Sequence, residues 1–261
     1  MCAFGFQSIP WACGTREYGT RGAVFGAKRE LHAAVEGEPE AGVNVNERLT
    51  QLTGIPSVLP IDFLTCTLWP NNPLFHPTIL YGLFADWDMK TPYAEDAVPK
   101  KIYGDCTEKS AEMVELMDAE VQAIAAAVRL LQPDNRHLDL VRPLKDCLIG
   151  HYKEQIGDPS SLLTILRTNS GYNSHFITYK KVEGGLIPDV GHKFFTTDLP
   201  YGLCIYKDIA LQVGVATPTI DTLIMWNQKM VGKEMMVDGK LVGKDIAEAV
   251  IPSKFMSFKA K

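Results

Sequence analysis

Apolar positions recur with helical spacing most clearly between residues 107 and 132. They fall every three or four residues, at Met113, Met117, Val121, Ile124, Val128 and Leu131. This spacing places them on one face of a helix, with most of the charged side chains on the others. Asp105 or Thr107 is expected to cap the start of the helix, and Pro133 to end it.

Further helical patterns fill most of the chain after residue 46. One helix is expected around residues 138–148, and another begins at the capping Asp158 with Pro159 in its first position and a body over 162–167. Two more cover 208–216 and 219–231, separated by Pro218, and a short one covers 243–250. Val237 to Lys240 has the signature of a tight turn.

Residues 169–205 break the helical pattern, being rich in Gly, Pro, Asn, His, Thr and Tyr. We expect a loop-rich insertion without regular structure, and loops of that length are often functional.

Residues 1–45 differ from the rest of the chain in composition, with many Gly and Ala. The stretch 23–26 is typical of a short buried strand followed by a turn and a helix start, the trailing edge of an α/β unit. Residues 37–42 form a plausible boundary loop. The predicted fold class is therefore mainly α: an α/β remnant over 1–45 and a helical domain over 46–261.

Composition narrows the function. The 261 residues are 46% hydrophobic and 22% charged, as in ordinary globular proteins, and the net charge of −5 argues against nucleic acid as the main partner. No stretch of about 18 apolar residues predicts a membrane span. The six cysteines are scattered, with no metal-binding spacing, so we expect free, mostly buried thiols, no metal and a cytoplasmic protein.

His76 is the first candidate for chemistry. Pro77 favours an extended backbone at His76 and is suited to the first position of a helix. The positive end of the helix dipole disfavours a charged imidazole and a nearby carboxylate favours it, a balance that suits an acid/base catalyst. The alternative is a histidine that caps a helix or fills a polar niche.

Asp198 and Lys193 are the next candidates. Asp198 precedes the turn-like Leu199-Pro200-Tyr201-Gly202, where its carboxylate would orient an imidazole. Lys193 would hold a substrate carboxylate. The alternatives are a turn-capping aspartate and a surface lysine. We expect His175 and His192 to be structural.

Cys13 lacks a visible partner base and is expected to pack against a pocket rather than to act as a nucleophile. The glycines do not follow the GxGxxG or P-loop spacing.

Several segments together resemble the octopine/nopaline (opine) dehydrogenase family. They are Pro10-Trp11-Ala12-Cys13, Phe75-His76-Pro77, residues 184–202 with Phe194-Phe195-Thr196-Thr197-Asp198, and residues 214–226. The resemblance covers roughly residues 4–250.

This resemblance implies an N-terminal Rossmann domain that binds NAD or NADP and a helical domain of the 6-phosphogluconate-dehydrogenase-like type. The implied reaction condenses a keto acid, usually pyruvate, with an amino acid or amine and reduces the imine. His76 matches the acid/base residue and Asp198 its orienting partner. Lys193 matches the carboxylate-binding position and Cys13 a pocket residue. Asn72 and Tyr81 are weaker candidates for shaping the pocket.

Two departures from the family pattern stand out. Lys193 replaces an arginine, and lysine cannot form a planar bidentate clamp. The glycine turn that holds a dinucleotide is absent, so we expect an incomplete chain and leave the cofactor-binding residues unknown. The alternatives are a non-enzymatic helical binding module, an inactive fragment, or a relative acting on a 2-hydroxy acid. The oligomeric state and the amine substrate stay open.

Overall fold

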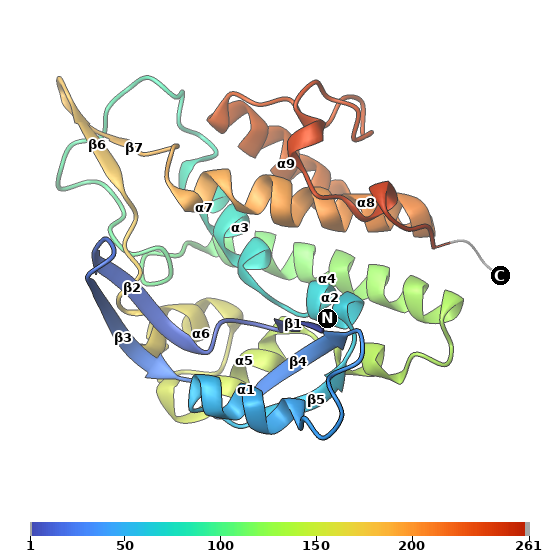
Figure 1. The fold of residues 1–261 in the computed structure, drawn as a ribbon. Coiled ribbons are helices and arrows are strands. Elements are labelled where there is room, and N and C mark those ends of the chain that lie inside the picture. Colours follow the sequence, from blue (N-terminus) through green and yellow to red (C-terminus); the bar gives the residue numbers. More distant parts are fainter. Residues whose placement is uncertain (1, 259–261) are drawn as a thin grey trace.

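A computed structural model shows a small sheet region followed by a larger helical body (Figure 1). It describes residues 2–258, and only the backbone of Ala12, Thr15, Arg16, Phe25, Leu59, Pro60 and Ile61. The strands are β1 (Ala3–Phe6), β2 (Trp11–Glu17), β3 (Arg21–Ala27), β4 (Leu31–Glu36), β5 (Ser57–Ile61), β6 (Tyr179–Val182) and β7 (Gly185–Pro188). The helices are α1 (Val45–Thr53), α2 (Phe63–Leu68), α3 (Asn72–Phe84), α4 (Glu108–Leu131), α5 (Leu144–Tyr152), α6 (Leu162–Thr168), α7 (Lys193–Thr196), α8 (Cys204–Val213) and α9 (Pro218–Val231).

The sheet region consists of a three-stranded sheet and a separate hairpin. In the sheet, β4 pairs with β1 antiparallel and with β5 parallel. Helix α1 makes the crossover from β4 to β5, as parallel neighbours require. Because β5 belongs to this sheet, the sheet region reaches Ile61, beyond the boundary predicted at residue 45.

The prediction for residues 23–26 was right about a strand and wrong about its surroundings. The stretch lies in β3, which pairs with β2 as a hairpin that projects from the sheet in Figure 1. Val24 is 65% exposed because no layer covers this part of the hairpin. The chain then runs directly into β4, and no helix follows β3.

The helical body is built around α4, as the apolar pattern predicted. Of the predicted apolar face, Met117, Val121, Ile124 and Val128 are fully buried, Met113 is partly buried, and Leu131 at the helix end is 37% exposed. Thr107 caps the start by accepting from the Ser110 N–H at 3.1 Å, and the helix ends before Pro133. Helices α3 and α4 lie between the sheet region and helices α8 and α9 (Figure 1). The mainly α fold class is confirmed.

Other helix boundaries differ from the prediction for local reasons. Helix α6 starts at a capping box between Ser161 and Thr164, while Asp158 instead accepts from the Ser160 N–H in the preceding loop. Pro143 divides the helix predicted over 138–148 into a 3-10 turn and α5. The stretch 243–250 contains only a single 3-10 turn.

The turn predicted from Val237 to Lys240 is confirmed, because the two residues exchange backbone hydrogen bonds of 2.9 Å. Residues 169–205, by contrast, are more regular than expected. They contain the β6–β7 hairpin, the short helix α7 and the π-helical turn Leu199–Leu203, which leads directly into α8.

The cysteines are free thiols, as expected, but only Cys106 and Cys204 are buried. The expectation of mostly buried thiols was therefore wrong. Within residues 2–258 no helix combines the length and the apolar character needed to cross a membrane.

The close approach of α3 to α4 can be tested at Gly82. A Cβ at this position would collide with the side chain and backbone of Ser110. We expect Gly82→Ala to lower the free energy of unfolding by about 1–3 kcal/mol, the usual cost of overpacking. The measurement is urea denaturation followed by circular dichroism.

Gly150→Ala in α5 is the matched control, because nothing lies within 4 Å of a Cβ there. The control should gain up to about 1 kcal/mol, since alanine is the better helix former. Equal stability of the two variants would contradict the close packing of α3 on α4.

Candidate active site

His76 lies inside a helix rather than before one, which corrects the prediction. Helix α3 starts at Asn72 with Pro73 in its first turn, so Pro77 is an internal proline. The helix tolerates Pro77 because only the hydrogen bond to the Pro73 carbonyl, near the helix start, is lost. His76 is thereby fixed on the second turn of a buried helix, 6% exposed.

Asp198 directly precedes a turn over Leu199–Leu203, as expected from the sequence, and this turn is π-helical. Asp198 is also 6% exposed. The two side chains meet across 122 residues of sequence: His76 Nδ1 lies 2.8 Å from Asp198 Oδ2. The predicted convergence of this imidazole and this carboxylate is therefore present in the fold.

Three contacts hold the pair in position. The ring of Phe194 on α7 packs against His76, with centroids 4.3 Å apart. Gly202 allows the π-helical turn to approach Pro73, because a Cβ on Gly202 would collide with the proline ring. The Tyr206 hydroxyl donates to Asn71 Oδ1 at 3.1 Å, which joins α8 to the start of α3.

The hydrogen bond fixes the tautomer of His76. A carboxylate only accepts, so the proton lies on Nδ1 and points to Asp198. Nε2 makes no hydrogen bond to the described residues, and it is not among their fully buried atoms that lack a partner. Nε2 is therefore the nitrogen that remains accessible for proton transfer, as in other histidines oriented by a carboxylate.

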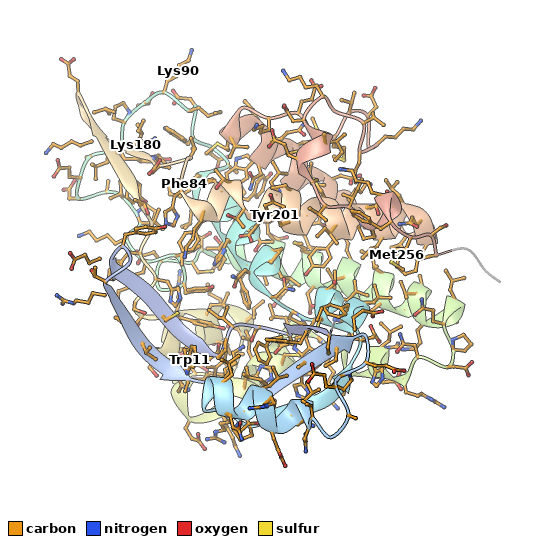
Figure 2. The ribbon with its side chains drawn as sticks, in the orientation of Figure 1. Trp11, Phe84, Lys90, Lys180, Tyr201 and Met256 are labelled. Carbon is orange, nitrogen blue, oxygen red and sulfur yellow. The ribbon has the colours of Figure 1, made fainter. Side chains whose placement is uncertain are left out.

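A cavity of about 630 Å³ lies between the sheet region and the helical body. Asp198 is among its lining residues, and Asn72 lines it as well, as predicted for a residue that shapes the pocket. His76 itself is not a lining residue, but its hydrogen-bond partner Asp198 is. Tyr201, labelled in Figure 2, lines the same wall.

Burial sets the protonation of several lining groups. It raises the pKa of the Tyr103, Tyr172 and Tyr206 hydroxyls, which therefore remain hydrogen-bond donors at neutral pH. Burial also lowers the pKa of His175, whose Nδ1 lies 3.4 Å from the Tyr172 carbonyl. The cavity thus presents neutral donors rather than negative charge along its aromatic side.

Two of the sequence candidates do not reach the cavity. Cys13 is exposed on β2, on the hairpin that projects from the sheet, and is not among the lining residues, so its pocket role stays a prediction. Tyr81 is not a lining residue, and its ring packs edge-on against Trp226, with centroids 5.5 Å apart. Its role in shaping the pocket stays a prediction.

Lys193 is not a lining residue either. Its Nζ is 5.9 Å from the centre of the Phe194 ring, the ring on which His76 packs. Lys193 therefore precedes a residue that contacts His76 and lies outside the cavity wall.

The sequence gave no reason to select several residues that line the cavity: Lys28, His151, Tyr152, Tyr172 and Tyr206. His175, expected to be purely structural, lines it too. These side chains come from the end of β3, from α5, from α8 and from the segment after α6. No short motif joins such distant segments, so only the fold identifies them.

Comparison with known proteins places this chain beside opine-forming enzymes. The profile described as "NAD/NADP octopine/nopaline dehydrogenase, alpha-helical domain" matches residues 61–231. The chain is 32% identical to octopine dehydrogenase of Pecten maximus over 252 residues, which is 96% of this chain and 62% of the relative. It is also 32% identical to tauropine dehydrogenase of Arabella iricolor, covering 96% of this chain and 63% of the relative.

Solved structures show the same similarity to octopine dehydrogenase. Octopine dehydrogenase with NADH and L-arginine superposes with a TM-score of 0.84 at 32% identity, over 97% of this chain and 62% of that chain. The structure with NADH and agmatine superposes with a TM-score of 0.85 at 31% identity, over 97% of this chain and 62% of that chain. The chain therefore spans a little under two thirds of the length of these relatives.

The charge state of Lys28 in the cavity wall predicts a pH dependence of stability. Burial lowers the pKa of this lysine from 10.5 to about 8. Its folded-state pKa is thus below the unfolded value, so it destabilises the fold while charged. That penalty shrinks as the pH rises from about 8 towards 10.5.

We expect Lys28→Met to stabilise the protein at pH 7 by on the order of 1–2 kcal/mol, with the gain diminishing by pH 10. Denaturant titrations of both proteins at several pH values measure the difference. A gain that stays constant across this range would show that the lysine is not desolvated.

Proposed function

Because this chain belongs to the octopine/nopaline dehydrogenase family, we propose that it supplies the catalytic helical part of an opine-type oxidoreductase acting on CH–NH bonds. In the proposed reaction a keto acid, pyruvate by preference, condenses with the amino group of an amino acid or amine. Water leaves, and the resulting C=N bond is reduced. The proposal depends above all on one observation, the hydrogen bond between buried His76 and Asp198 at the edge of a cavity.

The chemistry of this pair matches the proton transfers of the reaction. Asp198 accepts the Nδ1–H of His76, holds the ring in one orientation and stabilises the imidazolium once it forms. Nε2 would give a proton in the condensation and reduction direction and take one in reverse. The buried setting strengthens the interaction of Asp198 with the charged ring, because little water screens it.

Lys193 remains the proposed partner of the keto-acid carboxylate. Lys193 directly precedes Phe194, the ring that packs on His76, and this neighbourhood supports a cation on that side of the site. A lysine contributes a single point charge there rather than the fork of an arginine. Asn72, on the cavity wall, is the second polar group proposed to contact substrate.

The hydride of such a reduction comes from NADH or NADPH in this family, and the described residues do not fit the dinucleotide. The loop from β4 to α1 contains Gly37 and Gly42 but no GxGxxG, and it contains Glu38 and Glu40, which would repel a pyrophosphate. We therefore assign no residue of this chain to the cofactor.

The sheet region has a proposed counterpart in the relatives. The parallel pair of β4 and β5, joined by α1, is the arrangement found in nucleotide-binding domains. We propose that residues 1–45, together with the strand that ends at Ile61, correspond to part of such a domain. A cytoplasmic location remains a prediction from the free cysteines.

A non-enzymatic binding module is the second candidate, favoured by the lack of a dinucleotide cradle in the described residues. NADH titration separates the two. Saturable quenching of NADH fluorescence at micromolar protein would show that the chain holds the cofactor without a GxGxxG turn, and would support the enzyme. An unchanged signal up to millimolar NADH supports the module.

Substitution of His76 tests the catalytic proposal directly. We expect His76→Gln to lower kcat by about 10²-fold or more, the usual contribution of general acid/base catalysis. Asp198→Asn should lower it as well, because the ring loses its orienting charge. The assay follows NADH oxidation with pyruvate and an amine.

His137→Gln is the matched control, because this histidine lies in the 3-10 turn Arg136–Leu140 and does not line the cavity. It should retain normal turnover. If His76→Gln also turned over normally, His76 would have no acid/base role.

A further inference from the structure

The charged groups of the cavity wall are few. Of the residues that line it, the only carboxylate is Asp198, which is already engaged by His76, and the only lysine is Lys28. The wall therefore has an available positive charge and no available negative one.

Lys28 has no acidic partner among the described residues, because its neighbours use the nearby acids. Arg29 pairs with Glu154, and Glu30 lies 3.3 Å from His32. The Lys28 backbone N–H donates to the Pro10 carbonyl at 3.1 Å, which fixes the chain where β3 ends. The ammonium group is thus left for a ligand in the cavity.

His151 stands close to Lys28 in a fixed orientation. Its ring stacks on buried Trp69, with centroids 6.4 Å apart, and His32 stacks on the same tryptophan at 5.1 Å. Burial, and then the charges of Lys28 and His32, lower the pKa of His151, while Glu30 opposes them. A neutral His151 supplies an N–H donor beside the lysine.

The part of the cavity wall formed by Lys28 and His151 is separate from the His76–Asp198 pair. Lys28 follows Ala27, whose strand partner is Trp11, and Figure 2 shows Trp11 well apart from Tyr201, which lines the wall near Asp198. A ligand that spans the cavity would therefore place one end near Asp198 and the other near Lys28.

We propose that Lys28 and His151 form an anion subsite that binds the carboxylate or sulfonate of the amine co-substrate, and that the cavity disfavours co-substrates whose other end is a guanidinium or ammonium. A desolvated cation would find no free carboxylate in this wall, whereas an anion would gain a charge-assisted hydrogen bond. The co-substrate role rests on the proposed function, but anion binding at Lys28 does not.

Titration calorimetry at pH 7, with and without NADH, tests the subsite with four probes: taurine, β-alanine, agmatine and pyruvate. Taurine and β-alanine carry an amine and an acid group, and agmatine carries two cations and no acid. We expect both amino acids to bind at least about tenfold more tightly than agmatine, a difference equal to one charge-assisted hydrogen bond.

Lys28→Met should weaken the binding of taurine and β-alanine by about tenfold or more and the binding of pyruvate by less. Lys28→Arg should restore most of the binding. The control is Lys90→Met, since Lys90 is exposed and Figure 2 shows it far from Trp11. Cooperative thermal unfolding at or above the wild-type midpoint shows that each variant is folded, since Lys28→Met is itself expected to gain stability.

Three results would overturn the subsite: agmatine binding as tightly as taurine, Lys28→Met binding taurine normally, or no binding of either amino acid. These outcomes are distinct from failure of the proposed function. Lack of NADH-dependent turnover with taurine binding intact would refute the enzyme and leave the subsite in place. Turnover with arginine as the preferred amine would support the enzyme and refute the subsite.

Discussion

The hydrogen bond between His76 and Asp198 is the interaction on which the rest of the site depends. Both groups are buried, so neither finds water as a substitute partner, and loss of one would leave the other unsatisfied. The two residues come from α3 and from the π-helical turn before α8. The packing of Gly202 on Pro73 and the contact of Tyr206 with Asn71 hold these two elements together. The helical body thus acts as a rigid support for one imidazole.

The sequence predicted those features that depend on local pattern. Helix α4 follows from its apolar spacing and its Thr107 cap, and the pairing of His76 with Asp198 followed from segments that resemble a known family. The prediction that His76 lies just before a helix was wrong, because tertiary burial of α3 outweighs the preference of Pro77 for an extended neighbour. The sequence did not show that Cys13 lies exposed on a projecting hairpin, because composition does not distinguish such a hairpin from a buried strand. Lys28 and His151 share a wall only through folding, so no sequence pattern marks them.

The free positive charge of the cavity wall and the His76–Asp198 pair come from different parts of the chain. The sheet region, through the segment around Lys28, supplies the free positive charge, and the helical body supplies the imidazole proposed to transfer protons. A small substrate that contacts both would bridge the two parts and exclude water from the space between them. Closely packed walls of neutral tyrosines suit this arrangement, because they donate hydrogen bonds without adding charge. In this proposal the sheet region binds the anionic end of the substrate, and the helical body transfers the proton at the same cavity.

The π-helical turn Leu199–Leu203 has a consequence for how the chain can change. A π turn holds one residue more than an α turn, so it is related to an ordinary helix by a single insertion. Removal of one residue there would rejoin the backbone to the regular spiral of α8. Each residue of an α-helix advances by about 100°, so everything upstream would rotate by that angle. The Asp198 carboxylate would then swing away from α3, even though every side chain that now forms the site would still be present in the sequence.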